Sequence, residues 1–93
     1  MGIEIRHDEE NQRFVASVDG TEAVVQYGRP DEGTLDLFRT YTPEALRGRG
    51  IAGHIVEAAL EYARTAGLRV VPSCPYVARF IEKHDEHQSL VAG

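Results

Sequence analysis

A segment with the pattern of a long amphipathic helix lies between two short apolar stretches, and it constrains the fold more than any other feature. After Gly50, apolar residues recur at i, i+4 spacing through 51–63, which predicts a helix of about four turns with one buried stripe. Gly67 stands where a left-handed residue commonly ends a helix. Strand-like residues occupy 34–41 before the helix and 68–71 after it. Because a crossover helix generally joins two parallel strands, the sequence predicts a right-handed β-α-β unit.

The residues before this unit alternate between apolar and polar side chains, which is typical of antiparallel strands. Alternation with a period of two predicts strands at 3–5, 14–18 and 23–27. Between the last two, Asp19-Gly20 predicts a tight hairpin turn, because glycine readily accepts a positive φ. The Gly, Pro and Asp residues of 28–33 predict a second turn before the next strand. These signals predict an antiparallel N-terminal meander.

Two further helical segments follow the strands. Thr42-Pro43 predicts a short helical turn, with the threonine hydroxyl as its cap and proline at the first helical position. Pro75 predicts the start of a last helix, with Val77, Phe80 and Ile81 on one side. The predicted order is β-β-β-β-α-β-α, an α+β fold.

Length and composition are those of a small globular protein. The chain has 93 residues, of which 42% are apolar and 27% charged, so we expect a single domain over residues 1–93 with a thin core. A single cysteine excludes an intrachain disulfide framework, and neither a membrane-spanning run nor a secretory signal is evident, which predicts a cytoplasmic protein. The net charge of −5 argues against nucleic acid as a partner and mildly favours amines. A thin core is compatible with a monomer or a homodimer.

Glycines and arginines gather between the strand at 34–41 and the long helix, in the segment Arg47-Gly48-Arg49-Gly50-Ile51-Ala52-Gly53. A helix N-terminus presents unpaired N–H groups and a partial positive charge. Glycines let a phosphate approach the backbone, and the arginines add charge. An isolated Gly-x-Gly is more simply a turn with solvated arginines. The combination of strand, basic glycine loop and long helix instead predicts a phosphate site that is neither a Walker loop nor a dinucleotide fingerprint.

Cys74 follows the second predicted parallel strand, immediately before the last helix. Open α/β sheets bind ligands at the carboxyl ends of their parallel strands, so one ligand can reach both the glycine loop and this thiol. A helix start lowers the pKa of a thiol, which suits a nucleophile that accepts an acyl group from a thioester. The alternative is a buried and inert small residue, the commoner role of a lone cysteine.

Residues 40–91 resemble the small GNAT-like family of N-acetyltransferase domain-containing proteins. The matching motifs are Arg47-x-x-Gly50-x-Ala52, Ala58-Ala59-Leu60-x-Tyr62-Ala63-Arg64 and Gly67-Leu68-x-Val70-Val71-Pro72-x-Cys74-Pro75-Tyr76-Val77. The resemblance implies the GNAT (acyl-CoA N-acyltransferase) fold, acetyl-CoA as co-substrate and a cysteine close to the coenzyme A sulfur. It places the pyrophosphate on the amides of 47–52 and the pantetheine arm between two splayed parallel strands. The candidate coenzyme-binding residues are Thr40, Tyr41, Thr42, Arg47, Gly48, Arg49, Gly50, Ile51, Ala52, Gly53, Cys74, Pro75 and Arg79.

The candidate catalytic residues are Cys74 and Tyr76. Tyrosines serve as general acids for the departing thiolate in many GNAT enzymes, although Tyr76 can equally pack the last helix. Two features depart from the family pattern. The chain starts with strands where GNAT enzymes carry N-terminal helices, and Arg39-Thr40-Tyr41 replaces His-Thr-Glu, so a glutamate base is missing.

Three functions are compatible with these residues. The leading hypothesis is an acetyl-CoA-dependent N-acetyltransferase that acts on an amine, such as a lysine, a polyamine or another small amine. The alternatives are a non-catalytic acyl-CoA-binding module and a small interaction protein with a vestigial loop. No metal is expected, because His84-x-x-His87 lacks a third ligand at suitable spacing. The histidines are predicted to be solvated or to cap helices.

Overall fold

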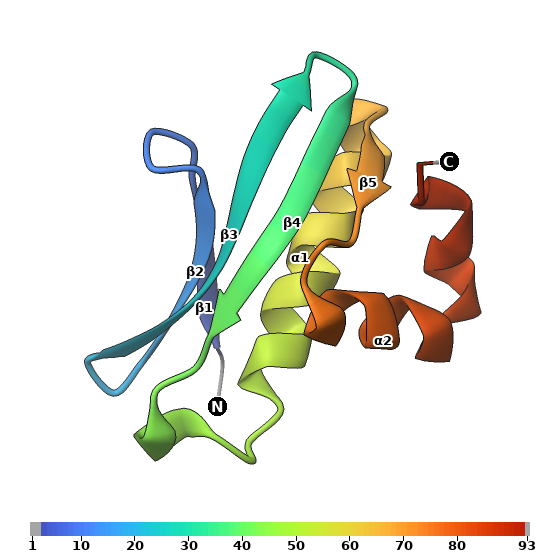
Figure 1. Ribbon diagram of the computed structural model, residues 1–93. Coiled ribbons are helices and arrows are strands. Elements are labelled where there is room, and N and C mark those ends of the chain that lie inside the picture. The colour runs from blue at the N-terminus through green and yellow to red at the C-terminus, as the bar shows by residue number, and fades with distance from the viewer. Residues whose placement is uncertain (1–2, 93) are drawn as a thin grey trace.

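Four strands in a row form an antiparallel meander at the start of the computed structural model, which describes residues 3–92 (Figure 1). They are β1 (Glu4–Asp8), β2 (Arg13–Val18), β3 (Thr21–Asp31) and β4 (Thr34–Tyr41). Each pairs antiparallel with the next along the chain. The predicted meander is therefore confirmed.

The β-α-β unit completes the sheet. Helix α1 (Ile51–Ala66) leads from β4 to β5 (Arg69–Val71), and these two strands pair in parallel, with Leu35 opposite Val70. The strand order across the sheet is β1-β2-β3-β4-β5. Gly67 ends α1 at φ 73° and donates its N–H toward the last carbonyls, as predicted. The sheet and the crossover helix together confirm the predicted α+β order.

Helix α2 (Pro75–Lys83) and two short 3₁₀ segments, η1 (Glu44–Leu46) and η2 (Asp85–Leu90), complete the fold. Pro75 begins α2 as expected, since proline lacks only an N–H that is unpaired at that position. The predicted cap of η1 is wrong: Pro43 occupies the N-cap position, and no side chain caps this segment. Segment η2 has no counterpart among the predicted elements.

The turns were predicted with mixed success. Asp19 and Gly20 both have positive φ, 51° and 78°, which confirms the hairpin turn. The turn predicted over 28–33 is wrong, because β3 continues to Asp31. The register shifts between Gly28 and Asp31, and such an irregularity tolerates a proline, which cannot donate to the ladder. The tight turn follows, where the Asp31 carboxylate accepts the Gly33 N–H at 2.9 Å.

One face of the sheet packs against the apolar stripe of α1 and forms the core. Figure 1 shows α1 behind the sheet and α2 beyond the edge of β5. The fully buried core side chains include Val25, Leu35, Leu37, Ile55 and Leu60. No helix among residues 3–92 covers the opposite face of the sheet, which we call the open face. Neither helix of this described chain combines the length and apolar character needed to cross a bilayer.

The last described residues lie along the outer edge of β5. Val91 forms a parallel bridge with Val70, and the Ala92 N–H donates to the Val70 carbonyl at 2.9 Å. The Arg69 guanidinium donates to the Val91 carbonyl at 2.8 Å. This tail therefore fixes the position of β5 beside β4.

Candidate functional site

The glycine loop ends at the N-terminus of α1, which has no side-chain cap. Gly48 and Gly50 have positive φ, 78° and 74°, a conformation that other residues adopt at a cost. Gly50 is the N-cap residue, so no side chain accepts the first N–H groups of the helix. The N–H groups of 51–53 therefore lack partners within the helix and can receive an anion.

A pocket of about 170 Å³ lies against this helix end. The glycine loop and the first two residues of α1, Ile51 and Ala52, line this pocket together with Tyr76 of α2. The lining residues are Thr42, Leu46, Arg47, Gly48, Gly50, Ile51, Ala52 and Tyr76. Six of the sequence-predicted coenzyme residues thus surround one space, together with the predicted general acid. Leu46 was not predicted, and its apolar character carries no signal beyond core packing.

Two of the candidate residues, Tyr41 and Arg49, lie outside this pocket, whereas Arg47 holds the loop in place. Arg47 donates from Nε to the Thr42 carbonyl at 2.9 Å, which ties the loop back to the end of β4. Arg49 is exposed and does not line the pocket. Tyr41 is 45% exposed on the open face, with the Arg39 guanidinium 5.5 Å from its ring centre. Tyr41 and Arg49 are therefore not brought together with the loop pocket.

Cys74 occupies the position where β5 gives way to α2. It is the N-cap residue of α2 and is only 7% exposed. Its N–H donates to the Leu37 carbonyl of β4 at 2.9 Å, and its Sγ lies 3.7 Å from Thr40 Oγ1. The two parallel strands thus bring the thiol to the end of β4, at the same edge of the sheet as the glycine loop.

The surroundings of Cys74 favour the thiolate. Burial raises the pKa of the thiol, but hydrogen bonds from the Val77 backbone N–H and the Thr40 hydroxyl lower it. The backbone N–H of Tyr76 acts in the same direction, and the pKa lies below its ordinary value as a result. The first turn of α2 therefore supplies the donors that an N-cap thiolate can accept.

The pH dependence of Cys74 alkylation should reflect the lowered pKa of this thiol. We expect the rate of reaction with iodoacetamide to rise with a midpoint below that of free cysteine, about pH 8.5. Thr40→Val removes a donor to the thiolate and should move the midpoint upward, whereas Thr42→Val should leave it unchanged. A wild-type midpoint at or above that of free cysteine would contradict this account.

A second hollow of about 190 Å³ adjoins the first across Tyr76 and lies along α2. It is lined by Tyr76, Arg79, Phe80, Lys83 and His84, which include two cationic side chains one turn apart. Gly53 faces the same helix: a Cβ there would lie 3.5 Å from Tyr76 Oη and from Phe80 Cε2. Gly53 thus permits the close approach of α1 and α2.

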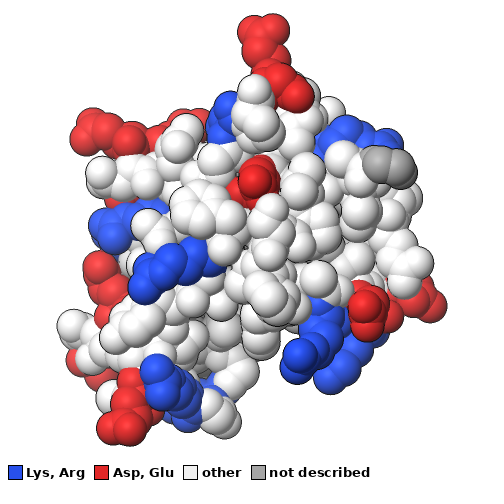
Figure 2. Space-filling model, viewed as in Figure 1, with Lys and Arg blue, Asp and Glu red and all other residues white. Residues whose placement is uncertain are grey.

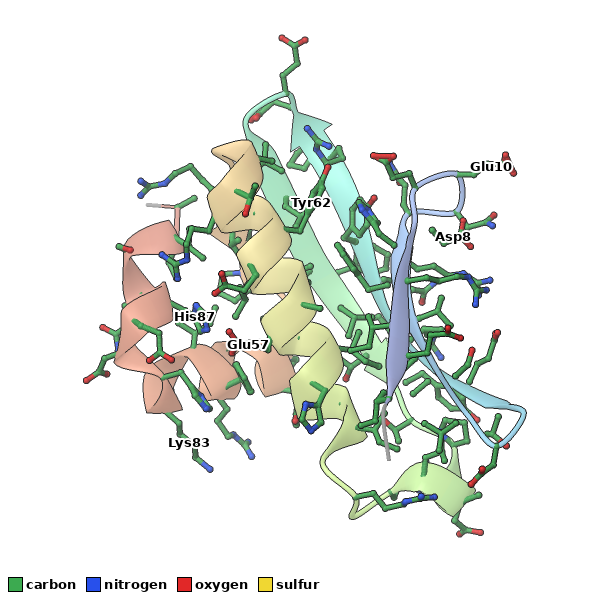
Figure 3. All side chains as sticks on the ribbon, turned by 180° about the vertical axis from the view of Figure 1, so that it is seen from behind. Asp8, Glu10, Glu57, Tyr62, Lys83 and His87 are labelled. Atoms are coloured by element: carbon green, nitrogen blue, oxygen red, sulfur yellow. The ribbon has the colours of Figure 1, made fainter. Side chains whose placement is uncertain are left out.

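His87 is fully buried and caps no helix, so the prediction that it is solvated or caps a helix is wrong. Figure 3 shows His87 of η2 and Glu57 of α1 pointing toward one another. Arg64 donates to His87 Nδ1 at 2.9 Å, and guanidinium groups only donate, so Nε2 carries the proton given to Glu57 at 2.9 Å. These contacts fasten η2 to α1. Glu57, Glu61 and His87 have the spacing of metal ligands, but Arg64 already supplies the positive charge beside them.

A larger hollow lies away from the glycine loop. It has a volume of about 400 Å³ and is shared between β1–β2 and the outer side of α1, where Figure 3 labels Tyr62. His7 stacks on Phe14 there, with ring centres 4.1 Å apart, and meets Tyr62 edge to face, with ring centres 4.4 Å apart. None of the predicted site residues lines it. The loop pocket is smaller, but it unites an unpaired helix end with the phenol of Tyr76.

The fold is that of an acyltransferase, and the chain belongs to the GCN5-related N-acetyltransferase family. The family model matches residues 13–90, which span β2 to the end of η2. The resemblance deduced from the sequence motifs is confirmed by this match.

Relatives cover nearly the whole chain. The chain is similar to Protein NATD1 of Bos taurus, at 33% identity over 95% of this chain and 80% of the relative. Protein NATD1 of Danio rerio is 31% identical, over 95% of this chain and 82% of the relative. Among solved structures, the solution structure of a GCN5-like protein from Staphylococcus aureus superposes with a TM-score of 0.76 at 26% identity, covering 97% of this chain and 88% of that one.

Proposed function

We propose that the protein is an acetyl-CoA-dependent N-acetyltransferase that acts on an amine. The observation that carries this proposal is the uncapped N-terminus of α1, which opens on a pocket lined by Tyr76, two residues after Cys74 in the chain. Phosphate oxygens suit the free N–H groups of 51–53. A thioester that extends from these phosphates toward the end of β4 would approach the Cys74 thiol.

The loop has room for the coenzyme. A Cβ at Gly48 or Gly50 would meet no atom within 4 Å, so a phosphate has access to both backbones. The adjoining hollow with Arg79 and Lys83 offers two cations to a further phosphate of the same ligand. The proposal also includes the other candidate coenzyme-binding residues, which are Thr40, Tyr41, Thr42, Arg49, Gly53 and Pro75. Of these, Tyr41 and Arg49 do not line the pocket.

Acetyl transfer from a thioester to an amine requires few catalytic side chains of the protein. The neutral amine nitrogen attacks the thioester carbonyl carbon, the C–S bond breaks, and the amine proton leaves as the amide forms. Tyr76 can give its phenolic proton to the departing coenzyme thiolate and then recover one from solvent. In a two-step route, the Cys74 thiolate first takes the acetyl group from the coenzyme and then yields it to the amine.

A non-catalytic acyl-CoA-binding module is the second candidate function. It is favoured by Tyr41, which stands where the family pattern has a glutamate, and by the lining of the loop pocket, which contains no acidic side chain among residues 3–92. A module of this kind needs the phosphate contacts but no group that takes a proton from the amine.

Calorimetry and a transfer assay separate these candidates. We expect acetyl-CoA to bind with a dissociation constant well below millimolar, and acetyl transfer to appear in a screen of amines and peptide lysines. Binding without transfer to any amine would favour the module, and no heat at millimolar ligand would remove both. Intact mass of wild type and Cys74→Ser then tests the route: turnover by Cys74→Ser without any acetylated wild type excludes acyl-Cys74.

A further inference from the structure

The hydroxyl group of Tyr76 is a hydrogen-bond donor that meets no acceptor within residues 3–92. Tyr76 is the second residue of α2, and 42% of it is exposed. The phenol of Tyr27, by contrast, lies 2.6 Å from His7 Nε2 and is held by that bond. A phenolic hydroxyl donates one hydrogen and rotates to suit its partner, so the Tyr76 hydroxyl is available to a ligand.

Packing places this hydroxyl beside the first turn of α1. A Cβ at Gly53 would lie 3.5 Å from Tyr76 Oη, so the hydroxyl rests against the backbone of the third residue of the helix. His54 is the first residue of α1 whose N–H bonds back into the helix, to the Gly50 carbonyl at 3.3 Å. The phenolic O–H therefore lies next to the turn whose N–H groups lack partners.

The hydroxyl and these N–H groups belong to one pocket. Tyr76 lines the loop pocket together with Gly50, Ile51 and Ala52, whose backbone would surround the proposed pyrophosphate. Both kinds of donor lack an acceptor, and the oxygens of a pyrophosphate supply several. A hydrogen bond to a charged oxygen is roughly twice as strong as one between neutral groups. A phenol in this place therefore suits an anion.

The Cys74 thiol opens on a different space. Neither Thr40 nor Cys74 lines the loop pocket or the hollow along α2. Thr40, which touches the thiol, lies opposite the buried Val25 and thus on the core side of the sheet. The pantetheine arm of coenzyme A separates its sulfur from its pyrophosphate. A hydroxyl beside the phosphates is therefore remote from a thioester that lies beside Cys74.

The surroundings of Tyr76 are electropositive on both sides of its ring. The helix N-terminus carries a partial positive charge on the side of the loop pocket. The hollow on the other side is lined by Arg79 and Lys83. Figure 2 shows basic side chains gathered over α2, at the lower right of the view. A ligand that carries several phosphate groups is thus favoured where Tyr76 stands.

We propose that Tyr76 donates its phenolic hydrogen to the pyrophosphate of the coenzyme. This inference rests on the proposed function and assigns the role of one residue in it. Of the two roles open to this hydroxyl, the geometry favours phosphate binding over proton donation to the departing thiolate. The donor adds to the N–H groups of 51–53, and the contact with Gly53 holds the ring in place.

Titration of wild type and Tyr76→Phe with two ligands tests this role without turnover. Coenzyme A carries a pyrophosphate and a thiol, whereas ADP carries a pyrophosphate alone. We expect Tyr76→Phe to bind both ligands about tenfold more weakly, because each loses one hydrogen bond to a charged oxygen. The ring remains, so the melting temperature should not change. Tyr62→Phe removes a phenol that does not line the loop pocket and should bind both ligands as wild type does.

The outcomes separate this role from the proposed function. Wild-type affinity of Tyr76→Phe for both ligands would overturn the role, and slower acetyl transfer at that affinity would assign the hydroxyl to the thiolate. Weaker binding of coenzyme A with unchanged binding of ADP would overturn it too, as would a wild type that binds coenzyme A but not ADP. In each of these cases the coenzyme site stands. A wild type that binds neither ligand would remove the proposed function and this role together.

Discussion

Gly50→Glu should reduce the affinity for acetyl-CoA by at least about 100-fold, or ~2.7 kcal/mol. Gly50 is the N-cap of α1, so the new carboxylate would lie beside the unpaired N–H groups of 51–53, which are proposed to bind the pyrophosphate. A Cβ at position 50 would meet no atom of the protein within 4 Å. The substitution should therefore act on ligand binding and not through a clash within the protein. Calorimetric titration of wild type and variant measures the difference.

Two controls isolate the charge. Gly50 has φ 74°, and a non-glycine residue there costs about 1–2 kcal/mol of stability, so Gly50→Ala reports the backbone strain alone. Gly20→Glu places the same charge at another positive-φ glycine, φ 78°, in the β2–β3 hairpin, which does not line the pocket. Both controls should bind within a few-fold of wild type. Binding by Gly50→Glu as tight as by Gly50→Ala would show that the pyrophosphate lies elsewhere.

His87→Ala should lower the free energy of unfolding by about 2–4 kcal/mol, a large fraction of the stability of a small domain. The substitution leaves a cavity at a fully buried side chain and removes the bonds from Nδ1 to Arg64 and from Nε2 to Glu57. Segment η2 then loses its attachment to α1. Urea unfolding followed by circular dichroism measures the loss.

His84→Ala is the matched control, because His84 lies on the same part of the chain and is only partly buried. It stacks on Phe80 with ring centres 4.0 Å apart and bonds the Phe80 carbonyl, so we expect a loss of only about 1 kcal/mol. Glu57→Gln retains an acceptor for Nε2 and should also be mild. Equal losses for His84→Ala and His87→Ala would mean that the buried network does not carry the stability.

Local patterns predicted the fold because most of its elements are specified by neighbouring residues. The i, i+4 apolar stripe predicted the buried face of α1, and Gly67 predicted where this helix ends. Asp19-Gly20 predicted the hairpin turn between β2 and β3. The turn was predicted over 28–33 partly because Pro30 has no N–H to donate to a strand ladder, and proline is therefore typical of turns. Here the ladder is irregular at Pro30, so no N–H is needed at that position. The strand accommodates it because the register shifts there.

Long-range partners explain what the sequence did not reveal about the sites. His87 bonds Glu57 and Arg64, which are 30 and 23 residues away, and no spacing rule connects them. The glycine loop was recognisable because strand, loop and helix are contiguous, whereas its pairing with Tyr76 requires the tertiary packing of α1 and α2.

The tail along β5 bears on how this small sheet avoids aggregation. A three-residue strand with a free edge would invite pairing with another chain, and Val91–Ala92 occupy that edge instead. The other edge, β1, carries the alternating charges of Glu4, Arg6 and Asp8, which discourage strand addition. The β5 edge is thus covered by the chain itself and the β1 edge carries charge, so neither edge of the sheet offers a template for fibrils.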